Sequence, residues 1–330
     1  MATPNLNATA VEDPTGPQAV EAAVIALQDH FWRNSEMQCL LIVDPLPQAL
    51  PTQAKNKHSL ADLPRTVVPI DHDSFPRSDC PYLLTLDPRA AQFGAWLAES
   101  VRVALADRRP DAISRVPGQR IGGWLATSAS ANDVAEHFSR QVLQLDDRGK
   151  TCALRFYDAR ALALLWPVLT LMQKETLLGP VKTWLAFDAG ARLQPYAGLY
   201  PKCLDRLSLK PEQWDVIRRH GLVNRALALH VAATGQQVEP GLVDAAIAAA
   251  ARAEFYELAD RDDKLAFISH ALVWHPYFDA HPRVRQALGQ VSQGDFYAAA
   301  ASELTPDEID AIRSGTWYAG KQNDRGGLGV

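Results

Sequence analysis

The chain has 330 residues, a hydrophobic content of 47% and a formal net charge of −5. This length suits one large domain or two ordinary ones, and the apolar content can build a sizeable core. The mild acidity argues against a broad electrostatic attraction to nucleic acid or to an anionic membrane surface. Two short basic pairs, Arg108–Arg109 and Arg218–Arg219, are expected to be solvated surface near helix ends.

The four cysteines, Cys39, Cys80, Cys152 and Cys203, are not spaced as CxxC, and each lies in or beside an apolar run. This pattern favours reduced thiols over a disulfide framework or a zinc ribbon. The polar N-terminus lacks the basic and apolar regions of a secretory signal, and no run is long enough for a membrane span. We therefore expect a cytoplasmic protein that does not associate with membranes.

Strand and helix signals alternate in the first two thirds of the chain. Residues 1–16 are expected to be a disordered lead-in because they are small, polar and proline-containing. Ser130 and Asp133 predict the start of a helix that extends to Leu145. Short apolar runs predict strands at 38–44, 66–70, 81–86, 121–128, 152–157 and 181–187. Apolar stripes and breakers predict helices at 18–33, 93–105, 158–166 and up to Leu178.

Strand signals vanish after about residue 208. The sequence therefore predicts an α/β (α+β) domain over 17–206, with a mixed sheet flanked by helices. An all-α lobe over 207–318 and a flexible tail over 319–330 are expected to follow. Helical stripes in the lobe cover 211–233, 241–258, 262–274, 283–291 and 305–314.

A search for catalytic motifs finds no GxSxG elbow, Walker A loop, GxGxxG or HExxH. The loop Asp71-His72-Asp73 follows a predicted strand and carries possible metal ligands. Neighbouring residues of a strand point to opposite faces, so only Asp71 and Asp73 converge. A solvated polar turn is the favoured interpretation of this loop.

A second cluster, HALVWHPYFDAHP, contains His270, His275 and His281. The first two histidines are five residues apart, which does not place two imidazoles on one helix face. Pro276 and Pro282 favour a helix–helix corner in which aromatic rings pack and the histidines form local hydrogen bonds. A metal-dependent hydrolase that uses these histidines with Asp71 and Asp73 remains an alternative hypothesis.

The stretch LRFYDARALALL, 154–165, crowds Arg155, Tyr157, Asp158 and Arg160 at a predicted strand-to-helix junction. Alternation along the strand would place Arg155 and Tyr157 on one face. Asp158 is expected to cap the helix and Arg160 to pair with it or with a nearby carboxylate. Each polar residue then has a structural role, and we favour that interpretation over an active site.

The same stretch, followed by LLGPVKTWLAFD at 177–188, resembles the signature of the bacterial type VI secretion adaptor-chaperones, whose shared domain has no assigned function. QCLLIVDPL, CPYLLTLD and GGWLATSAS extend the resemblance over about 37–190. Ala159 stands where the family has proline. The matching signature residues, taken as fold determinants, are Arg155, Tyr157, Asp158, Arg160, Gly179, Pro180 and Trp184.

The resemblance implies a non-catalytic chaperone or adaptor without a metal or cofactor. Such proteins bind one cognate toxin effector in the cytoplasm and promote its loading onto the VgrG spike. The expected partners are therefore proteins, not nucleic acid, and the sequence does not identify the effector-binding residues. A third hypothesis is that the chain is itself a toxin.

Overall fold

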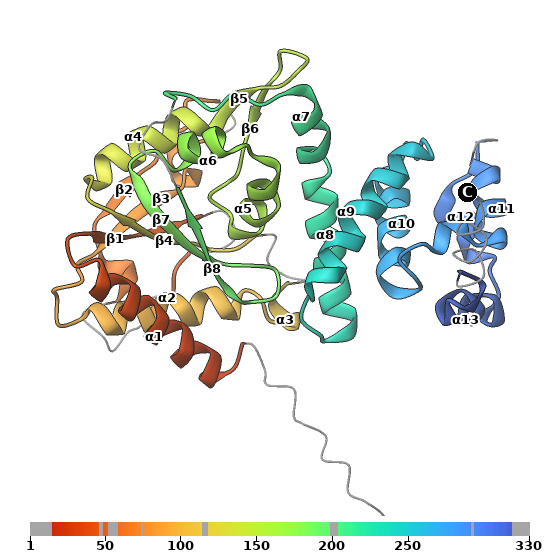
Figure 1. Cartoon of the computed structure of the whole chain (residues 1–330), viewed down its shortest axis with the longest axis horizontal. Coiled ribbons are helices and arrows are strands. Elements are labelled where there is room, and N and C mark those ends of the chain that lie inside the picture. Colours follow the sequence, from red (N-terminus) through yellow and green to blue (C-terminus); the bar gives the residue numbers. More distant parts are fainter. Residues whose placement is uncertain are drawn as a thin grey trace, which may run out of the picture.

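The computed structural model describes residues 15–45, 49–51, 59–73, 75–113, 118–198, 204–291 and 294–318. An α/β part (residues 15–198) is followed by a helical part (residues 204–318) that extends from one side of it (Figure 1). The expected lead-in lies almost wholly outside the described residues, and the expected tail over 319–330 and Cys203 lie wholly outside them. No helix within the described ranges is long and apolar enough to cross a membrane.

One sheet organises the α/β part, and the described residues give it six strands in the order β2-β3-β1-β4-β7-β8. The expected fold class is confirmed, but the sheet is not mixed, because every described pairing is antiparallel. β3 and β4 run in the same direction on either side of β1, so their helical connection does not make them neighbours. The strands are β1 (Gln38–Val43), β2 (Arg65–Val67), β3 (Tyr82–Leu86), β4 (Ile121–Thr127), β7 (Val181–Phe187) and β8 (Leu193–Ala197), with a separate pair, β5 (Leu143–Leu145) and β6 (Thr151–Ala153).

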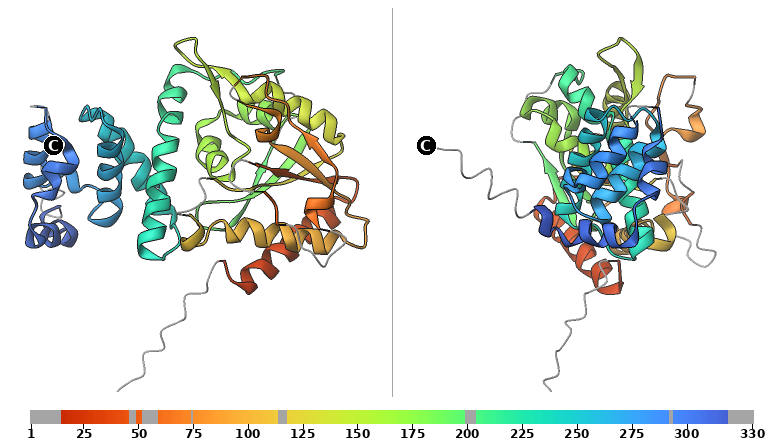
Figure 2. Two further views of the ribbon diagram at one scale, coloured as in Figure 1. Left: turned by 180° about the vertical axis from the view of Figure 1, so that it is seen from behind. Right: turned by 90° about the vertical axis from the view of Figure 1, so that its right-hand side faces the viewer.

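Alternating strand side chains contribute to two cores, one on each face of the sheet. Leu41 packs under α1 and α2, whereas Leu40 packs under α4, α5 and α6. Figure 2 shows the sheet between these layers. Burial of both faces explains why the strands are continuous apolar runs. The helices are α1 (Pro17–Arg33), α2 (Phe93–Ala106), α3 (Pro110–Ile113), α4 (Ala131–Val142), α5 (Ala159–Leu165) and α6 (Leu171–Leu178), and the short 3-10 turns are η1 (Leu60–Asp62), η2 (Arg77–Asp79) and η3 (Trp166–Val168).

Helix α4 begins as expected, with a reciprocal capping box between Ser130 and Asp133. It ends at Val142, so the expectation that Leu145 contributes to its buried side was wrong. Leu145 lies on β5 and is 68% exposed. The pairing of β5 with β6 takes this segment out of the helix.

The helical part has its own apolar core. The expected helix over 211–233 is two helices, because the amide of Arg219 bonds to the carbonyl of Val216, three residues back. Asp263 accepts hydrogen bonds from the amides of Tyr297 and Ala298 and so caps a helix that was not expected. The elements are α7 (Pro211–Ile217), α8 (His220–Thr234), α9 (Pro240–Phe255), α10 (Arg261–Val273), η4 (Phe278–Ala280), α11 (Pro282–Val291), α12 (Tyr297–Ser302) and α13 (Pro306–Ser314).

Apolar side chains cross the junction between the two parts in both directions. Leu164 of α5 belongs to the helical core. Leu207, Leu209 and Ile217 pack against the sheet core under α4, α5 and α6. The two parts therefore share packed residues, and the expected boundary between 206 and 207 stays a prediction.

Candidate functional site

The segment that links β6 to α5 is a tight turn, and the expected strand over 152–157 ends at Ala153. The amide of Phe156 bonds to the carbonyl of Leu154, and that of Asp158 bonds to the carbonyl of Arg155. Such short-range bonds do not occur within a strand. Leu154, Phe156 and Tyr157 are consequently all buried, so the expected alternation of faces was wrong.

Asp158 is the N-cap of α5 and is itself 5% exposed. Its carboxylate accepts a hydrogen bond from the amide of Arg160 at 3.0 Å and contacts the Arg160 guanidinium at 2.8 Å. Burial alone raises the pKa of Asp158, but the charge and hydrogen bonds of Arg160, together with the charge of Arg155, outweigh burial and lower this pKa overall. The ionised carboxylate thus accepts a hydrogen bond from a backbone amide at the start of α5 and also pairs with a mostly buried guanidinium.

Arg155 connects this turn to the sheet. Its guanidinium contacts the carboxylate of Asp44, the residue after β1, at 2.5 Å. Asp44 is fully buried, whereas 38% of the Arg155 side chain remains exposed. Arg155 therefore neutralises a buried carboxylate while part of its side chain remains exposed.

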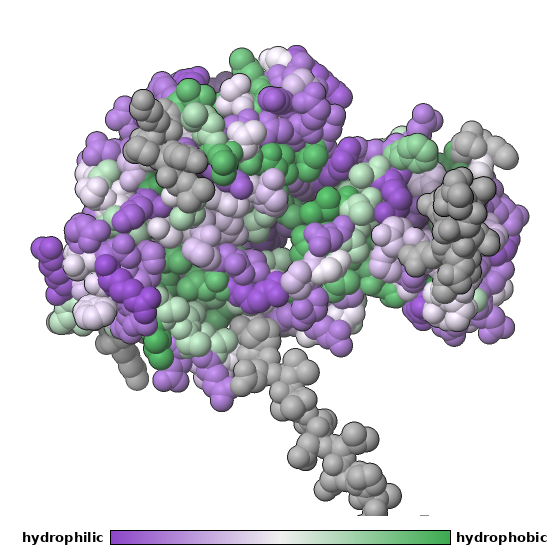
Figure 3. Space-filling view, in the orientation of Figure 1, coloured by the Kyte–Doolittle hydropathy of each residue, from purple (hydrophilic) through white to green (hydrophobic). Residues whose placement is uncertain are grey.

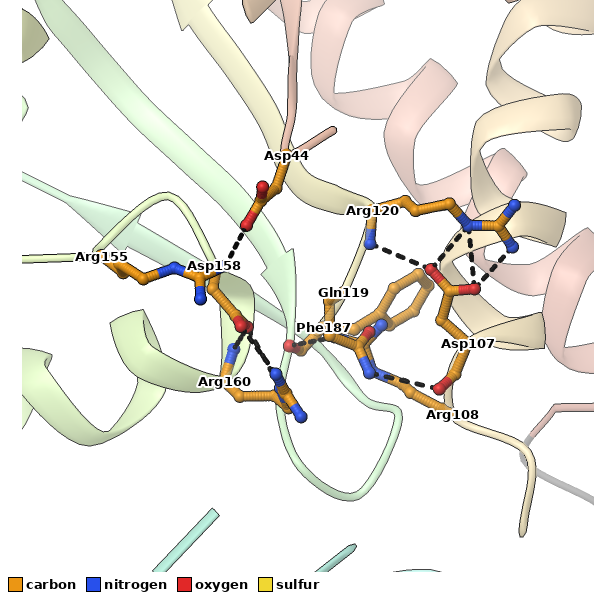
Figure 4. Close-up of polar contacts among 9 residues, drawn as sticks. All are labelled: Asp44, Asp107, Arg108, Gln119, Arg120, Arg155, Asp158, Arg160 and Phe187. Atoms are coloured by element: carbon orange, nitrogen blue, oxygen red, sulfur yellow. Dashed lines mark hydrogen bonds and ion pairs between the residues drawn. The ribbon is translucent and has the colours of Figure 1, made fainter. Parts of the chain in front are cut away.

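A second ion pair lies beside the first. Arg120, just before β4, contacts Asp107 at 2.5 Å, and Asp107 also accepts the Arg120 amide. Neighbouring Arg108 is 2% exposed and donates to the carbonyls of Ala104 and Phe187. Burial lowers the pKa of Arg108 to about 10. Figure 4 shows this network, which links the ends of β1 and β7, the start of β4 and the turn before α5.

Arg108 contradicts the expectation that both basic pairs are solvated surface. Two of its partner carbonyls, those of Phe187 and Asp188, lie at the end of β7, which the sequence could not place beside it. Arg109 is 60% exposed, as expected. Arg218 is exposed, as expected, whereas Arg219 is half-buried, and they form ion pairs with Asp147 and Glu254, respectively.

The other signature residues form contacts that hold the end of α6 and strand β7 in place. Gly179 ends α6 with a φ of 56°, and a Cβ there would stand 2.2 Å from the ring of His137. The carbonyl of Pro180 accepts the hydroxyl of Thr127 at 2.7 Å. Trp184 is fully buried and donates its indole N–H to the carbonyl of Gly122 at 3.0 Å.

A cleft of about 630 Å³ lies between the α/β part and the helical part. One wall consists of the 153–158 turn and α5, and the other consists of α8 with the start of α10. Apolar residues gather along this junction in the space-filling view (Figure 3). The lining residues include Ile113, Leu154, Arg155, Asp158, Arg160, Leu165, Ile217, His220, Asn224, Arg225, Ala228 and Arg261.

The charge of this lining is strongly one-sided. Four guanidiniums, those of Arg155, Arg160, Arg225 and Arg261, face a single carboxylate, that of Asp158, among the described lining residues. No serine, threonine, cysteine or lysine lines the described walls, and burial lowers the pKa of His220 to about 4. The arrangement offers cations for binding, and its described walls do not pair a nucleophile with a base.

The residues of the alternative metal site are not assembled. Asp71 and Asp73 are exposed in the loop after β2, on the α/β part. The three histidines lie in the helical part: His270 stacks on Trp274 at 3.7 Å, and His275 and His281 both contact the ring of Trp317. In the ranges the structure describes, no group of three or more His, Cys, Asp or Glu residues could hold a metal ion.

Sequence reasoning found Arg155, Asp158 and Arg160 but missed the other members of the network and the far wall of the cleft. Asp44 and Arg120 carry one local signal, since each directly flanks an apolar strand run. Arg225 and Arg261 carry none, because each is an ordinary polar position on its helix.

The model of a domain of unknown function (DUF4123) matches residues 71–176, about a third of the chain. The matched range contains Arg155, Tyr157, Asp158 and Arg160, and the remaining signature residues follow it directly. No curated protein and no solved structure matches the chain.

Proposed function

We propose that this protein is a non-catalytic adaptor-chaperone of a bacterial type VI secretion system. It binds one toxin effector in the cytoplasm and promotes the loading of that toxin onto the VgrG spike. Its partners are the toxin and the spike protein, and the function needs neither a metal nor a cofactor.

The observation that carries this proposal is the domain match over 71–176. The matched domain has no assigned function, as the resemblance to the adaptor-chaperones leads one to expect. The signature residues on which that resemblance rests lie within the match or just after it. Their geometry supports a structural role, since Asp158 caps a helix, Arg155 neutralises Asp44, and Trp184 is buried against β4.

The cleft supports a binding role. It is large enough for a short segment of a partner, within the range of about 300–1,000 Å³ that ligand sites occupy. Its walls combine guanidiniums with apolar side chains, which suits recognition of another protein better than chemistry on a small molecule.

Co-purification tests the proposal. The tagged full-length chain is expressed with the toxin and VgrG proteins encoded beside its gene, and a toxin from another cluster serves as the control. We expect the neighbouring toxin to co-purify and the control toxin not to. Deletion of the gene should abolish delivery of that toxin to target cells, and re-expression should restore it.

No stable complex with the neighbouring toxin, together with undiminished delivery after deletion, would overturn the proposal. Expression of the chain alone in a naive host separates it from the toxin hypothesis. Growth should continue, and growth arrest would favour the view that the chain is itself the toxin.

A further inference from the structure

We infer that the cleft binds an acidic, partly apolar peptide segment of the partner protein, with carboxylates against Arg155, Arg225 and Arg261. This inference rests on the proposed function, because it specifies which chemistry of the bound toxin the cleft recognises. Its basis is the charge of the cleft, the availability of its guanidiniums, and the apolar surface between them.

The charge of the cleft is opposite to that of the chain as a whole. The chain carries a formal charge of −5, yet its described cleft lining holds four guanidiniums and one carboxylate. Concave sites lined by one sign of charge concentrate their field and attract ligands of the opposite sign. An acidic segment would therefore be drawn to the cleft and repelled by much of the remaining surface.

Two of the guanidiniums are available. Among the described residues, the side chains of Arg225 and Arg261 have no hydrogen-bond or ion-pair partner. On the opposite wall, Arg155 contacts Asp44 through one nitrogen, and 38% of its side chain remains exposed. Five other arginines of the helical part do form ion pairs: Arg218, Arg219, Arg252, Arg283 and Arg313.

Two of the helix starts at the cleft are already occupied by side chains of the protein itself. Helix N-termini usually bind phosphate through free amides. Helices α5 and α10 begin at the cleft, and each is capped by its own carboxylate: Asp158 accepts the Arg160 amide, and Asp260 accepts the amides of Asp262 and Asp263. The side-chain donors that the cleft offers are guanidiniums, whose planar forks pair with the oxygens of an anionic group such as a carboxylate or a phosphate.

Apolar side chains between the guanidiniums favour a peptide over a bare anion. Ile113 and Ile217 line the cleft and are only partly buried. A segment that places carboxylates beside aliphatic side chains would satisfy both kinds of wall.

Fluorescence anisotropy on the purified full-length chain tests this inference. The probe is a labelled peptide of about twelve residues that combines glutamate and leucine, and its matched control carries glutamine in place of glutamate. A single-stranded oligonucleotide of the same charge is the third probe. We expect the glutamate peptide to bind most tightly of the three probes, and we expect its affinity to fall as the salt concentration is raised.

Matched variants locate the site. Arg225→Glu/Arg261→Glu should weaken binding of the glutamate peptide about tenfold or more, because two cationic contacts become repulsive. Arg206→Glu/Arg285→Glu changes the net charge equally at two exposed arginines outside the cleft, and should weaken binding less than about twofold. If circular dichroism shows that the Arg225→Glu/Arg261→Glu variant does not fold, the neutral variant Arg225→Gln/Arg261→Gln is used in its place.

Three results would overturn the inference: equal binding of the glutamine peptide, equal weakening by the control variant, or tighter binding of the oligonucleotide. Co-purification of the neighbouring toxin with the Arg225→Glu/Arg261→Glu variant at the unmodified level would also overturn it, while the proposed function stands. Failure of the unmodified chain to bind the toxin counts against the proposed function itself.

Discussion

Arg155 and Asp44 are 111 positions apart, yet the guanidinium of one contacts the carboxylate of the other at 2.5 Å. This contact ties the turn before α5 to the end of β1. Because Asp44 is fully buried, the contact supplies the counter-charge that a carboxylate in the protein interior needs.

Arg155→Gln should therefore reduce the free energy of unfolding by about 1–3 kcal/mol, because it leaves a buried carboxylate without its cation. Water reaches Arg155, so the loss should stay below that of a fully buried pair. Urea denaturation of Arg155→Gln, Asp44→Asn and the double variant measures the coupling. Additive losses would show that the contact contributes nothing.

Asp158→Ala should reduce the free energy of unfolding by about 2–4 kcal/mol. This loss exceeds the range of about 0.5–2 kcal/mol for a lost helix cap alone, because the substitution also removes the carboxylate that pairs with Arg160. Asp158→Asn keeps the helix cap and should reduce the free energy of unfolding by a smaller amount. Ser130→Ala, which removes a cap from α4 without an ion pair, is the control at about 1 kcal/mol. Lost toxin binding in a fully stable Asp158→Ala protein would contradict the structural role.

The free energy of unfolding should fall as the pH is lowered from 7 to 5. Burial lowers the pKa of His220 and of His270 to about 4, against about 6.5 in an unfolded chain. Between these values the unfolded chain binds more protons, so stability is fully present above pH 6.5 and is lost toward pH 4. Each histidine should contribute about 2 kcal/mol between pH 7 and 5. Urea titrations check this, and His270→Gln should flatten the dependence; an unchanged slope in that variant would refute the assignment.

Gly122→Ala should destabilise the protein by about 3 kcal/mol or more. A Cβ there would stand 2.0 Å from the carbonyl oxygen of Tyr157, so β4 and the turn before α5 would have to separate. Gly241→Ala on α9 meets nothing within 4 Å and should stabilise by up to about 1 kcal/mol. Thermal denaturation compares the two. Similar midpoints for both variants would show that the close approach is unimportant.

The central strands β1, β3, β4 and β7 were predictable because both faces of each are covered, which makes each a continuous apolar run. β8 was not, since it is an edge strand that contains Pro195, and edge positions tolerate proline and polar residues. The turn at 154–158 read as strand because its apolar residues are as buried as those of a strand. The close approach of Gly122 that shapes the turn comes from a distant segment.

The candidate site was predictable only where its residues are neighbours in sequence. Asp158 and Arg160 are two residues apart at the start of α5, where a capping carboxylate reaches the amides of the first turn, so the local sequence reveals them. Asp44, Asp107 and Arg120 acquire their roles when strand ends meet, and single charges beside apolar runs do not specify that meeting. The cleft depends on how α8 and α10 lie against α5, which no local pattern encodes.

Helix α5 buries Leu162 and Leu165 in the sheet core and Leu164 in the helical core. This helix therefore packs into both parts at once. A hinge motion that opened the cleft would have to remove Leu164 from the helical core or separate α5 from the sheet. A segment of the proposed toxin partner should then bind to a rigid, preformed cleft. Removal of the helices after residue 206 should expose the apolar side chains that pack against them, so the truncated protein should aggregate.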